Sequence, residues 1–184
     1  MSDPRADLLA ALPDLIAARI KLTLPELKTC KGQAGRFDLE ALKKKSIAAP
    51  AVLISNLGFA QGEAFSGPSP SFLLEMAAYV ITKDTITLPR DQAAATICQT
   101  LARLIPERIW GERDLGPARD LRGIPLLTAA SDHAVSLWAI TWRQPITLTG
   151  APLSEPQPIS LYVGQSPQIG AEHEDSYTQI GETP

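Results

Sequence analysis

The stretch Val135–Leu148, VSLWAITWRQPITL, carries the clearest structural pattern in this chain. Successive side chains of a β-strand point to opposite faces, so its alternation separates two sets of apolar residues. The sets are Trp138, Ile140 and Trp142 on one face, and Val135, Leu137, Ala139 and Thr141 on the other. Apolar side chains on both faces favour a strand inside a helix-backed sheet, or one that meets another subunit. The stretch therefore predicts a strand within a sheet, and it indicates no catalytic or binding function.

Length and composition indicate one folded domain with an appendage. The chain has 184 residues, of which 45% are hydrophobic, enough for a real core. No apolar run approaches the roughly 20 residues that cross a bilayer, and the start MSDPRADLL has no secretion-signal pattern. Cys30 and Cys98 show neither CxxC nor histidine spacing, so we expect reduced structural thiols. A soluble cytosolic protein is the expectation.

Charge is distributed unevenly along the sequence. Residues 1–50 hold nine Lys or Arg against six Asp or Glu, residues 51–148 eight against nine, and residues 149–184 none against five. This asymmetry predicts a basic surface near the amino end and an acidic carboxyl arm, which can meet within one molecule or between neighbours. The net charge of −3 argues against nucleic acid as a partner, because binding phosphate requires concentrated cations.

The amino-terminal half predicts a helix followed by strands. Leu12, Ile16 and Ile20 have helical spacing, and Pro13 either kinks one helix or opens a second; we favour a main helix from Pro13 to Leu22. ELKTC (26–30) suggests an edge strand, and Asp38 can cap a short helix. The apolar run from Val52 to Leu57 has the composition of a buried central strand.

The following segments predict a hairpin and a second helix. SFLLEMAAYVITKD (71–84) alternates as a strand and pairs with the preceding one through a long loop at Ala60–Ser71. DQAAATICQTLARLI (91–105) is clearly helical, and Pro106 ends it. Residues 106–122 mix charges, glycines and prolines, which favours an exposed connection pinned by Trp110. A short strand is expected near Ile124–Thr128.

The predicted fold class is therefore α+β. A small, mixed, mainly antiparallel sheet of four to five strands is expected to pack against two to three helices within residues 1–148. Residues 149–184 form a Pro-rich acidic arm with five prolines, which we expect to be extended. Its one plausible strand, Ile159–Val163, has the pattern of a segment that adds to an exposed sheet edge.

Residues suited to catalysis are few. Ser131, Asp132 and His133 are consecutive in a predicted turn, where side chains point apart, so a triad is not expected. GQAG (32–35) has no P-loop lysine and is interpreted as a turn. We expect no cofactor and no metal. Trp138 and Trp142 share one strand face, which favours the core or a subunit interface over a ligand platform.

The order of these elements resembles the tail-terminator proteins of Mu-like tailed phages and prophages. The match covers about residues 5–148, with Ala18–Lys21 and Leu24–Lys28 in place of the family's "ARIK…LP.LK" segment and Ala49–Ile54 in place of its "apAvlI" strand. The resemblance is one of pattern and topology, and the arm lies outside it.

The resemblance implies a structural virion protein without enzymatic activity. Such proteins form a ring, here expected to have six subunits, on the head-proximal end of the tail tube. There the ring ends tube polymerisation and joins the tail to the neck or head-completion protein, with possible contact to the sheath. Location in the virion, and in host cytoplasm during assembly, follows. Candidate interface residues are Trp138, Trp142, Ile159, Leu161 and Val163.

Three alternatives stay open. A neck or head-completion protein forms rings on a similar small fold. A non-viral α/β binding adaptor is the second alternative, with the arm as a recognition segment. The third is a small hydrolase that uses Asp132 or His133.

Overall fold

A computed structural model divides the chain into two units, Met1–Gly150 and Ala151–Pro184. The residues that the structure describes are 8–37, 47–62, 70–127, 134–148, 161–163, 169, 171–176 and 178–180.

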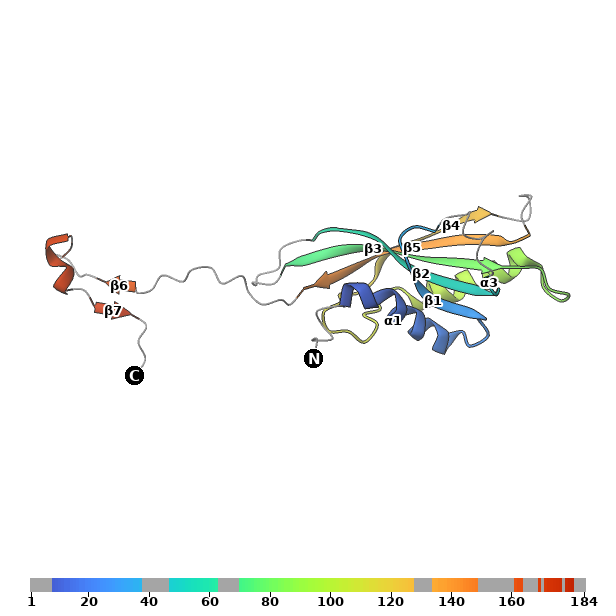
Figure 1. The fold of residues 1–184 in the computed structure, drawn as a ribbon, viewed down its shortest axis with the longest axis horizontal. Helices are drawn as coiled ribbons and strands as arrows, with labels where there is room; N and C mark the ends of the chain where they lie inside the picture. The colour runs from blue at the N-terminus through green and yellow to red at the C-terminus, as the bar shows by residue number, and fades with distance from the viewer. Residues whose placement is uncertain are drawn as a thin grey trace. The chain divides into compact units, whose positions relative to one another are not determined.

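The first unit is an α+β fold, as predicted (Figure 1). Its described helices and strands are α1 (Leu8–Thr23), β1 (Thr29–Ala34), β2 (Ala51–Gln61), β3 (Ser71–Thr82), α3 (Arg90–Leu104), β4 (Arg119–Leu127) and β5 (Ser136–Thr147). The strands form one sheet in the order β1-β2-β3-β5-β4. Only the β1–β2 pair is parallel, so the sheet is mixed and mainly antiparallel.

Strand β5 has the two apolar faces that its alternation predicts. Ile140 and Trp142 are buried in the larger core cluster, which includes residues of α1 and α3; we call this side of the sheet the helix face. Leu137 and Ala139 belong to a second buried cluster on the opposite side, the back face, where Tyr79 also lies. The strand's two-sided pattern therefore reflects burial on both sides.

Helix α1 begins at Leu8, so the predicted start at Pro13 is wrong. Pro13 lies inside the helix, and Leu8, Leu12 and Ile16 continue one buried stripe along it. An interior proline costs about 3 kcal/mol, whereas burying a leucine contributes about 1.5–3 kcal/mol. Two buried leucines before the proline therefore offset its cost.

Strand β1 lies further along the chain than predicted. The expected strand at 26–30 is observed at Thr29–Ala34, so the interpretation of GQAG as a turn is wrong for residues 32–34. The glycine and alanine there conceal a strand signal, and pairing with β2 together with the contacts to α1 replaces side-chain propensity. The helix expected at Asp38 falls outside the described residues.

Strands β2 and β3 form the predicted antiparallel hairpin. Strand β2 lies inside the sheet and continues to Gln61, into the segment expected to be loop. Its register shifts between Asn56 and Gly58, and Gly58 has a φ of 151°, which suits glycine. Most of the expected loop lies outside the described residues.

The helix α3 is confirmed, but the connection after it is not simply exposed. Trp110, Leu115 and Ala118 are buried, and β4 begins at Arg119, ahead of the strand predicted near Ile124. Trp110 therefore holds this connection against the domain, as predicted, and Leu115 and Ala118 are buried with it.

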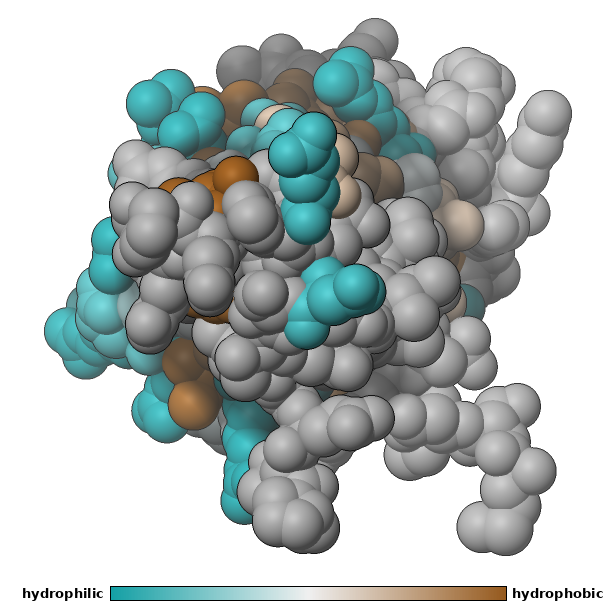
Figure 2. Space-filling view, turned by 90° about the vertical axis from the view of Figure 1, so that its left-hand side faces the viewer, coloured by the Kyte–Doolittle hydropathy of each residue, from teal (hydrophilic) through white to brown (hydrophobic). Residues whose placement is uncertain are grey.

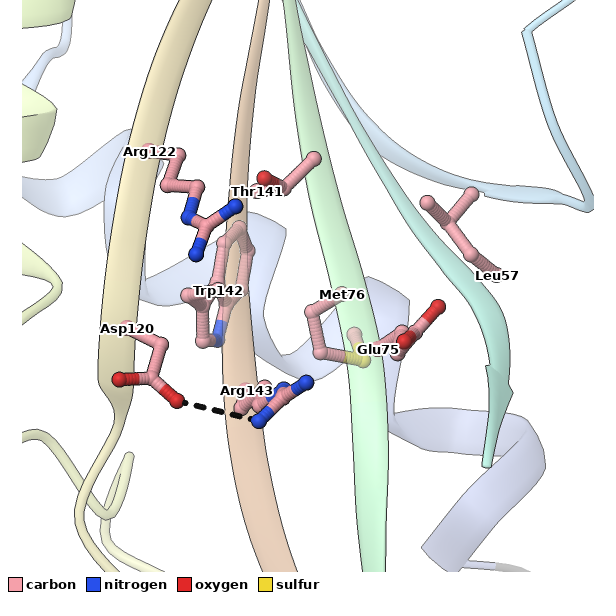
Figure 3. Close-up of a pocket in the computed structure, with 8 residues that line it drawn as sticks. All are labelled: Leu57, Glu75, Met76, Asp120, Arg122, Thr141, Trp142 and Arg143. Carbon is pink, nitrogen blue, oxygen red and sulfur yellow. Dashed lines mark hydrogen bonds and ion pairs between the residues drawn. The ribbon is translucent and has the colours of Figure 1, made fainter. Parts of the chain in front are cut away.

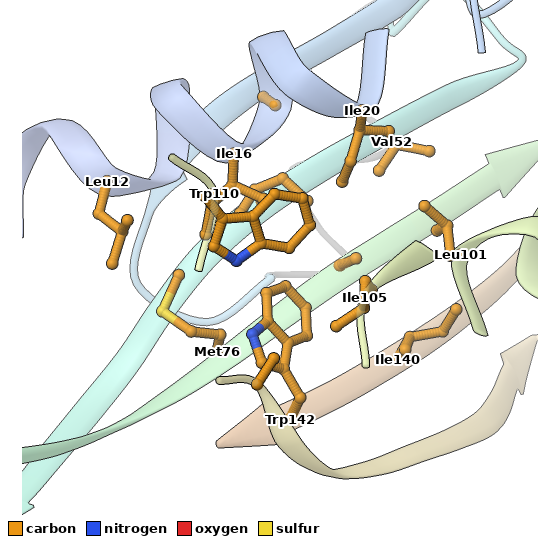
Figure 4. Close-up of a cluster of buried hydrophobic side chains, with 14 of the residues drawn as sticks. Leu12, Ile16, Ile20, Val52, Met76, Leu101, Ile105, Trp110, Ile140 and Trp142 are labelled. Carbon is orange, nitrogen blue, oxygen red and sulfur yellow. The ribbon is translucent and has the colours of Figure 1, made fainter. Parts of the chain in front are cut away.

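A buried glutamine organises this connection. Gln144 of β5 is 0% exposed, and its Oε1 accepts the indole N–H groups of Trp110, at 3.0 Å, and Trp142, at 3.2 Å. Its Nε2 donates to the carbonyl oxygens of Arg108, at 3.1 Å, and Gly116. Both tryptophans lie among the apolar side chains of α1 and α3 (Figure 4). One amide thus satisfies two indoles and two carbonyl groups.

The second unit contains more secondary structure than the sequence predicts. Strands β6 (Leu161–Val163) and β7 (Thr178–Ile180) pair antiparallel, and a short 3₁₀-helix, η1 (Ala171–Ser176), lies between them in sequence. β6 falls within the expected strand, whose Ile159 is outside the described residues. β7 and η1 were not predicted.

Candidate functional site

The edge of the sheet formed by β1 is closed by α1. The Asp14 carboxylate accepts the backbone N–H of Gly32 at 2.7 Å, and the Cys30 thiol donates to the Ala17 carbonyl oxygen at 3.2 Å. A Cβ on Gly32 would lie 2.9 Å from the backbone nitrogen of Asp14, closer than real Cβ contacts allow. The helix therefore approaches β1 so tightly that only glycine fits at this position.

The opposite edge, β4, is exposed. Among the strands that the structure describes, it pairs only with β5, and nearly all its side chains are solvent-exposed. Among them are two large apolar residues, Ile124 at 53% and Leu126 at 43% exposure. An edge strand presents unpaired backbone groups that can bind another strand, although Pro125 has no N–H to donate. We call this outward side of Arg119–Leu127 the β4 edge.

A shallow hollow of about 200 Å³ adjoins the β4 edge (Figure 3). The register between β4 and β5 shifts between Arg119 and Arg122, and Asp120 in this bulge has a φ of 55°. Aspartate tolerates this left-handed conformation better than most residues. The lining residues are Leu57, Glu75, Met76, Asp120, Arg122, Thr141, Trp142 and Arg143.

Opposite charges meet around the hollow. Asp120 and Arg143 form an ion pair at 3.4 Å, and Glu75 of β3 lies directly across from Arg143 in the strand register. Within the described part of the chain, Arg119 and Arg122 have no ion-pair partner. All five side chains are exposed, so water screens them. Such a surface suits ion pairing with a partner better than proton transfer, which needs groups held in fixed, sheltered positions.

A larger hollow, of about 450 Å³, lies between α1 and β1. Two of its polar lining side chains already serve the fold: the Asp14 carboxylate accepts the Gly32 N–H, and the Asn56 side-chain oxygen accepts the Gly58 N–H at 3.0 Å. We therefore regard the smaller hollow beside β4 as the better candidate site.

The predicted interface residues divide between core and surface. Trp142 is 2% exposed and belongs to the core. Trp138 is partly buried against the same cluster, and its indole N–H is buried without a hydrogen-bond partner among the described residues. Val163 is 42% exposed, and Leu161 lies in β6 beside it. Trp142 therefore lies in the core of this domain, and Val163 lies at the surface.

The residues considered for catalysis are Ser131, Asp132 and His133. Residues 131–133 lie outside the described part of the chain. Burial raises the pKa of Cys30 to about 11, with Lys21 partly opposing the effect, and burial raises the pKa of Cys98 to about 11. Both thiols are therefore protonated near neutral pH and weakly nucleophilic. The described residues contain no group of three or more His, Cys, Asp or Glu side chains that could hold a metal ion.

The described surface is mixed in polarity. On the face drawn in Figure 2, hydrophilic side chains surround smaller hydrophobic areas. None of the described helices is long and apolar enough to cross a membrane.

The sequence reasoning missed the charged cluster beside β4. Arg119, Asp120 and Arg122 fall in a stretch rich in glycine and proline, which indicates a loop. The available signal was RDLRGIPLL itself, a short run with charges at one end and apolar residues at the other. Proline and glycine within it are compatible with an edge strand.

No protein-family model matches this sequence, and no curated protein matches it significantly.

Proposed function

We propose that this chain is a structural assembly protein, the tail terminator of a Mu-like phage or prophage. It forms a ring on the head-proximal end of the tail tube, ends polymerisation of the tube protein, and presents a surface to the neck or head-completion protein. The resemblance of the element order to that family supports this proposal.

One structural observation carries the proposal: one edge of the sheet is covered by a helix, and the other edge is left open. Ile124 and Leu126 expose apolar surface on β4, and the adjoining hollow is shallow and charged. A small substrate is usually enclosed by a deeper, largely apolar pocket. An exposed strand edge with flanking charges instead favours a protein partner.

Deletion of the gene in the phage that encodes it tests this function. Electron microscopy is expected to show overlong tail tubes or tails that have no heads, and expression of the intact chain from a plasmid should restore normal particles. Normal tails joined to heads in the deletion strain would overturn the proposal.

An assay with purified proteins tests the termination step directly. Adding the chain to polymerising tail-tube protein should shorten the tubes, with the chain found at one tube end by immunogold labelling. Ile124→Asp should weaken this effect, whereas Leu22→Asp, at an exposed position on α1, serves as the matched control. Unchanged tube lengths with the intact chain would argue against a terminator.

A further inference from the structure

The β4 edge has the features of a receptor for an added strand. It is open along Arg119–Leu127, and it combines unpaired backbone groups with the exposed side chains of Ile124 and Leu126. Strand addition uses main-chain hydrogen bonds for affinity and alternate side chains for specificity. The incoming strand therefore needs apolar residues of its own.

The second unit contains strands that lack sufficient pairing. β6 and β7 have three residues each and, among the described strands, pair only with each other. Such a two-stranded ribbon is marginal in water, and a third strand or a packed surface is needed for stability. β6 carries Leu161 and Val163, with Val163 substantially exposed, so it has apolar side chains to offer to an edge.

Charge complements this fit. Residues 149–184 contain five Asp or Glu and no Lys or Arg. Glu172 and Asp175 of η1 are exposed. Beside the β4 edge, Arg143 is paired with Asp120, but Arg119 and Arg122 are available within the described residues. Opposite charges across an interface fix its register and accelerate association.

We propose that the β6–β7 ribbon of one copy adds to the β4 edge of a second copy, with the acidic residues of η1 near Arg119 and Arg122. The proposal rests on the proposed ring, because a ring requires two different complementary surfaces on each copy. The 12 residues between Leu148 and Leu161 span at most about 40 Å, more than the roughly 30 Å length of β4. The linker can therefore extend beyond the length of one such strand.

Disulfide trapping between full-length chains tests the contact. Ile124→Cys chains are mixed with Val163→Cys chains that carry a mass tag, and the mixture is oxidised at pH 8. The native thiols, with pKa values near 11, remain protonated and react slowly. A linked dimer with one chain of each kind is expected. Leu22→Cys replaces Ile124→Cys in the matched control, because Leu22 is also exposed.

Charge reversal tests the electrostatic part. Arg119→Glu with Arg122→Glu in the Ile124→Cys chain should lower the rate of linkage about tenfold at low salt. Glu172→Lys with Asp175→Lys in the Val163→Cys chain should restore much of it. Thermal unfolding of each variant verifies that the domain is folded.

Three results would overturn the proposal. Linkage no greater than the Leu22→Cys control would exclude the contact. A chain that carries both Ile124→Cys and Val163→Cys is oxidised in parallel. Linkage only within that chain, and none between chains, would place the arm on its own β4. Charge reversal without effect would remove the arginines from the contact. The deletion phenotype of the phage is independent of these results, so a terminator can hold even if this contact fails.

Discussion

Strands β1 and β4 form the two edges of one sheet, and only the first is covered by a helix. Asp14 and the tight approach of α1 to Gly32 occupy the β1 edge. The β4 edge instead exposes Ile124 and Leu126 and carries arginines, a proline and two register shifts. Charges, proline and bulges on an edge discourage indiscriminate strand pairing. The difference leaves β4 exposed, while its charges, proline and bulges limit random strand pairing.

The largest expected effect concerns Gln144, which binds the connection that leads into β4. Gln144→Leu leaves two indole N–H groups and the Gly116 carbonyl group without their hydrogen-bond partner, whereas the Arg108 carbonyl group keeps the Ala118 N–H at 3.1 Å. A buried unsatisfied group costs about 1–3 kcal/mol, so we expect a loss of at least about 3 kcal/mol in the free energy of unfolding. Urea denaturation measures it, with the exposed Gln61→Leu as control. A loss below about 1 kcal/mol would mean that the connection does not depend on this glutamine.

A pair of glycine substitutions compares the edges directly. Gly32→Val forces a side chain against Asp14 and should cost about 2 kcal/mol or more through overpacking. At Gly123 of β4, a Cβ would meet its nearest side-chain atom, on Ile140, at an ordinary 3.9 Å. Gly123→Val should therefore change stability by less than about 0.5 kcal/mol. Equal losses in thermal or urea unfolding would contradict the distinction between a closed and an open edge.

Substitutions of edge residues separate stability from assembly. Asp14→Ala removes the acceptor for the Gly32 N–H and should lower the free energy of unfolding by about 1 kcal/mol. Ile124→Asp should leave stability within about 0.5 kcal/mol of the unmodified chain yet reduce self-association. Urea unfolding and light scattering measure the two quantities, and Glu26→Ala is the exposed control for Asp14→Ala. If Ile124→Asp destabilised the domain more than Asp14→Ala, β4 would be structural rather than interactive.

The smallest effect concerns the thiol beneath α1. The pKa of Cys30 is raised above its usual 9.0 to about 11 in the native state, so its contribution to stability is complete below pH 9 and is lost as the pH rises through 11. Because the thiol is only partly buried, we expect less than about 1 kcal/mol. Comparison of the unmodified chain with Cys30→Ala across pH 8–11 measures the difference. Rapid labelling of Cys30 at pH 8 would show that α1 does not shield it.

Periodicity predicted the parts of the fold whose side chains alternate or repeat. β5 and α3 have long apolar patterns and were found where expected. β1 was displaced because Gly32 is required by a close contact with α1, which local sequence does not reveal. The connection before β4 was misjudged because Trp110 enters the core through Gln144, a residue distant in sequence. The charged cluster arises from register between β3, β4 and β5, and no single segment contains it.

The side-chain amide of Gln144 makes four hydrogen bonds, and this limits how the domain can be redesigned. Replacing either tryptophan removes one donor to the Gln144 side-chain oxygen, and replacing the glutamine leaves both indole N–H groups without an acceptor. The effects of single and combined substitutions on stability will therefore not be additive. A redesign that removes the glutamine would therefore have to replace both tryptophans as well.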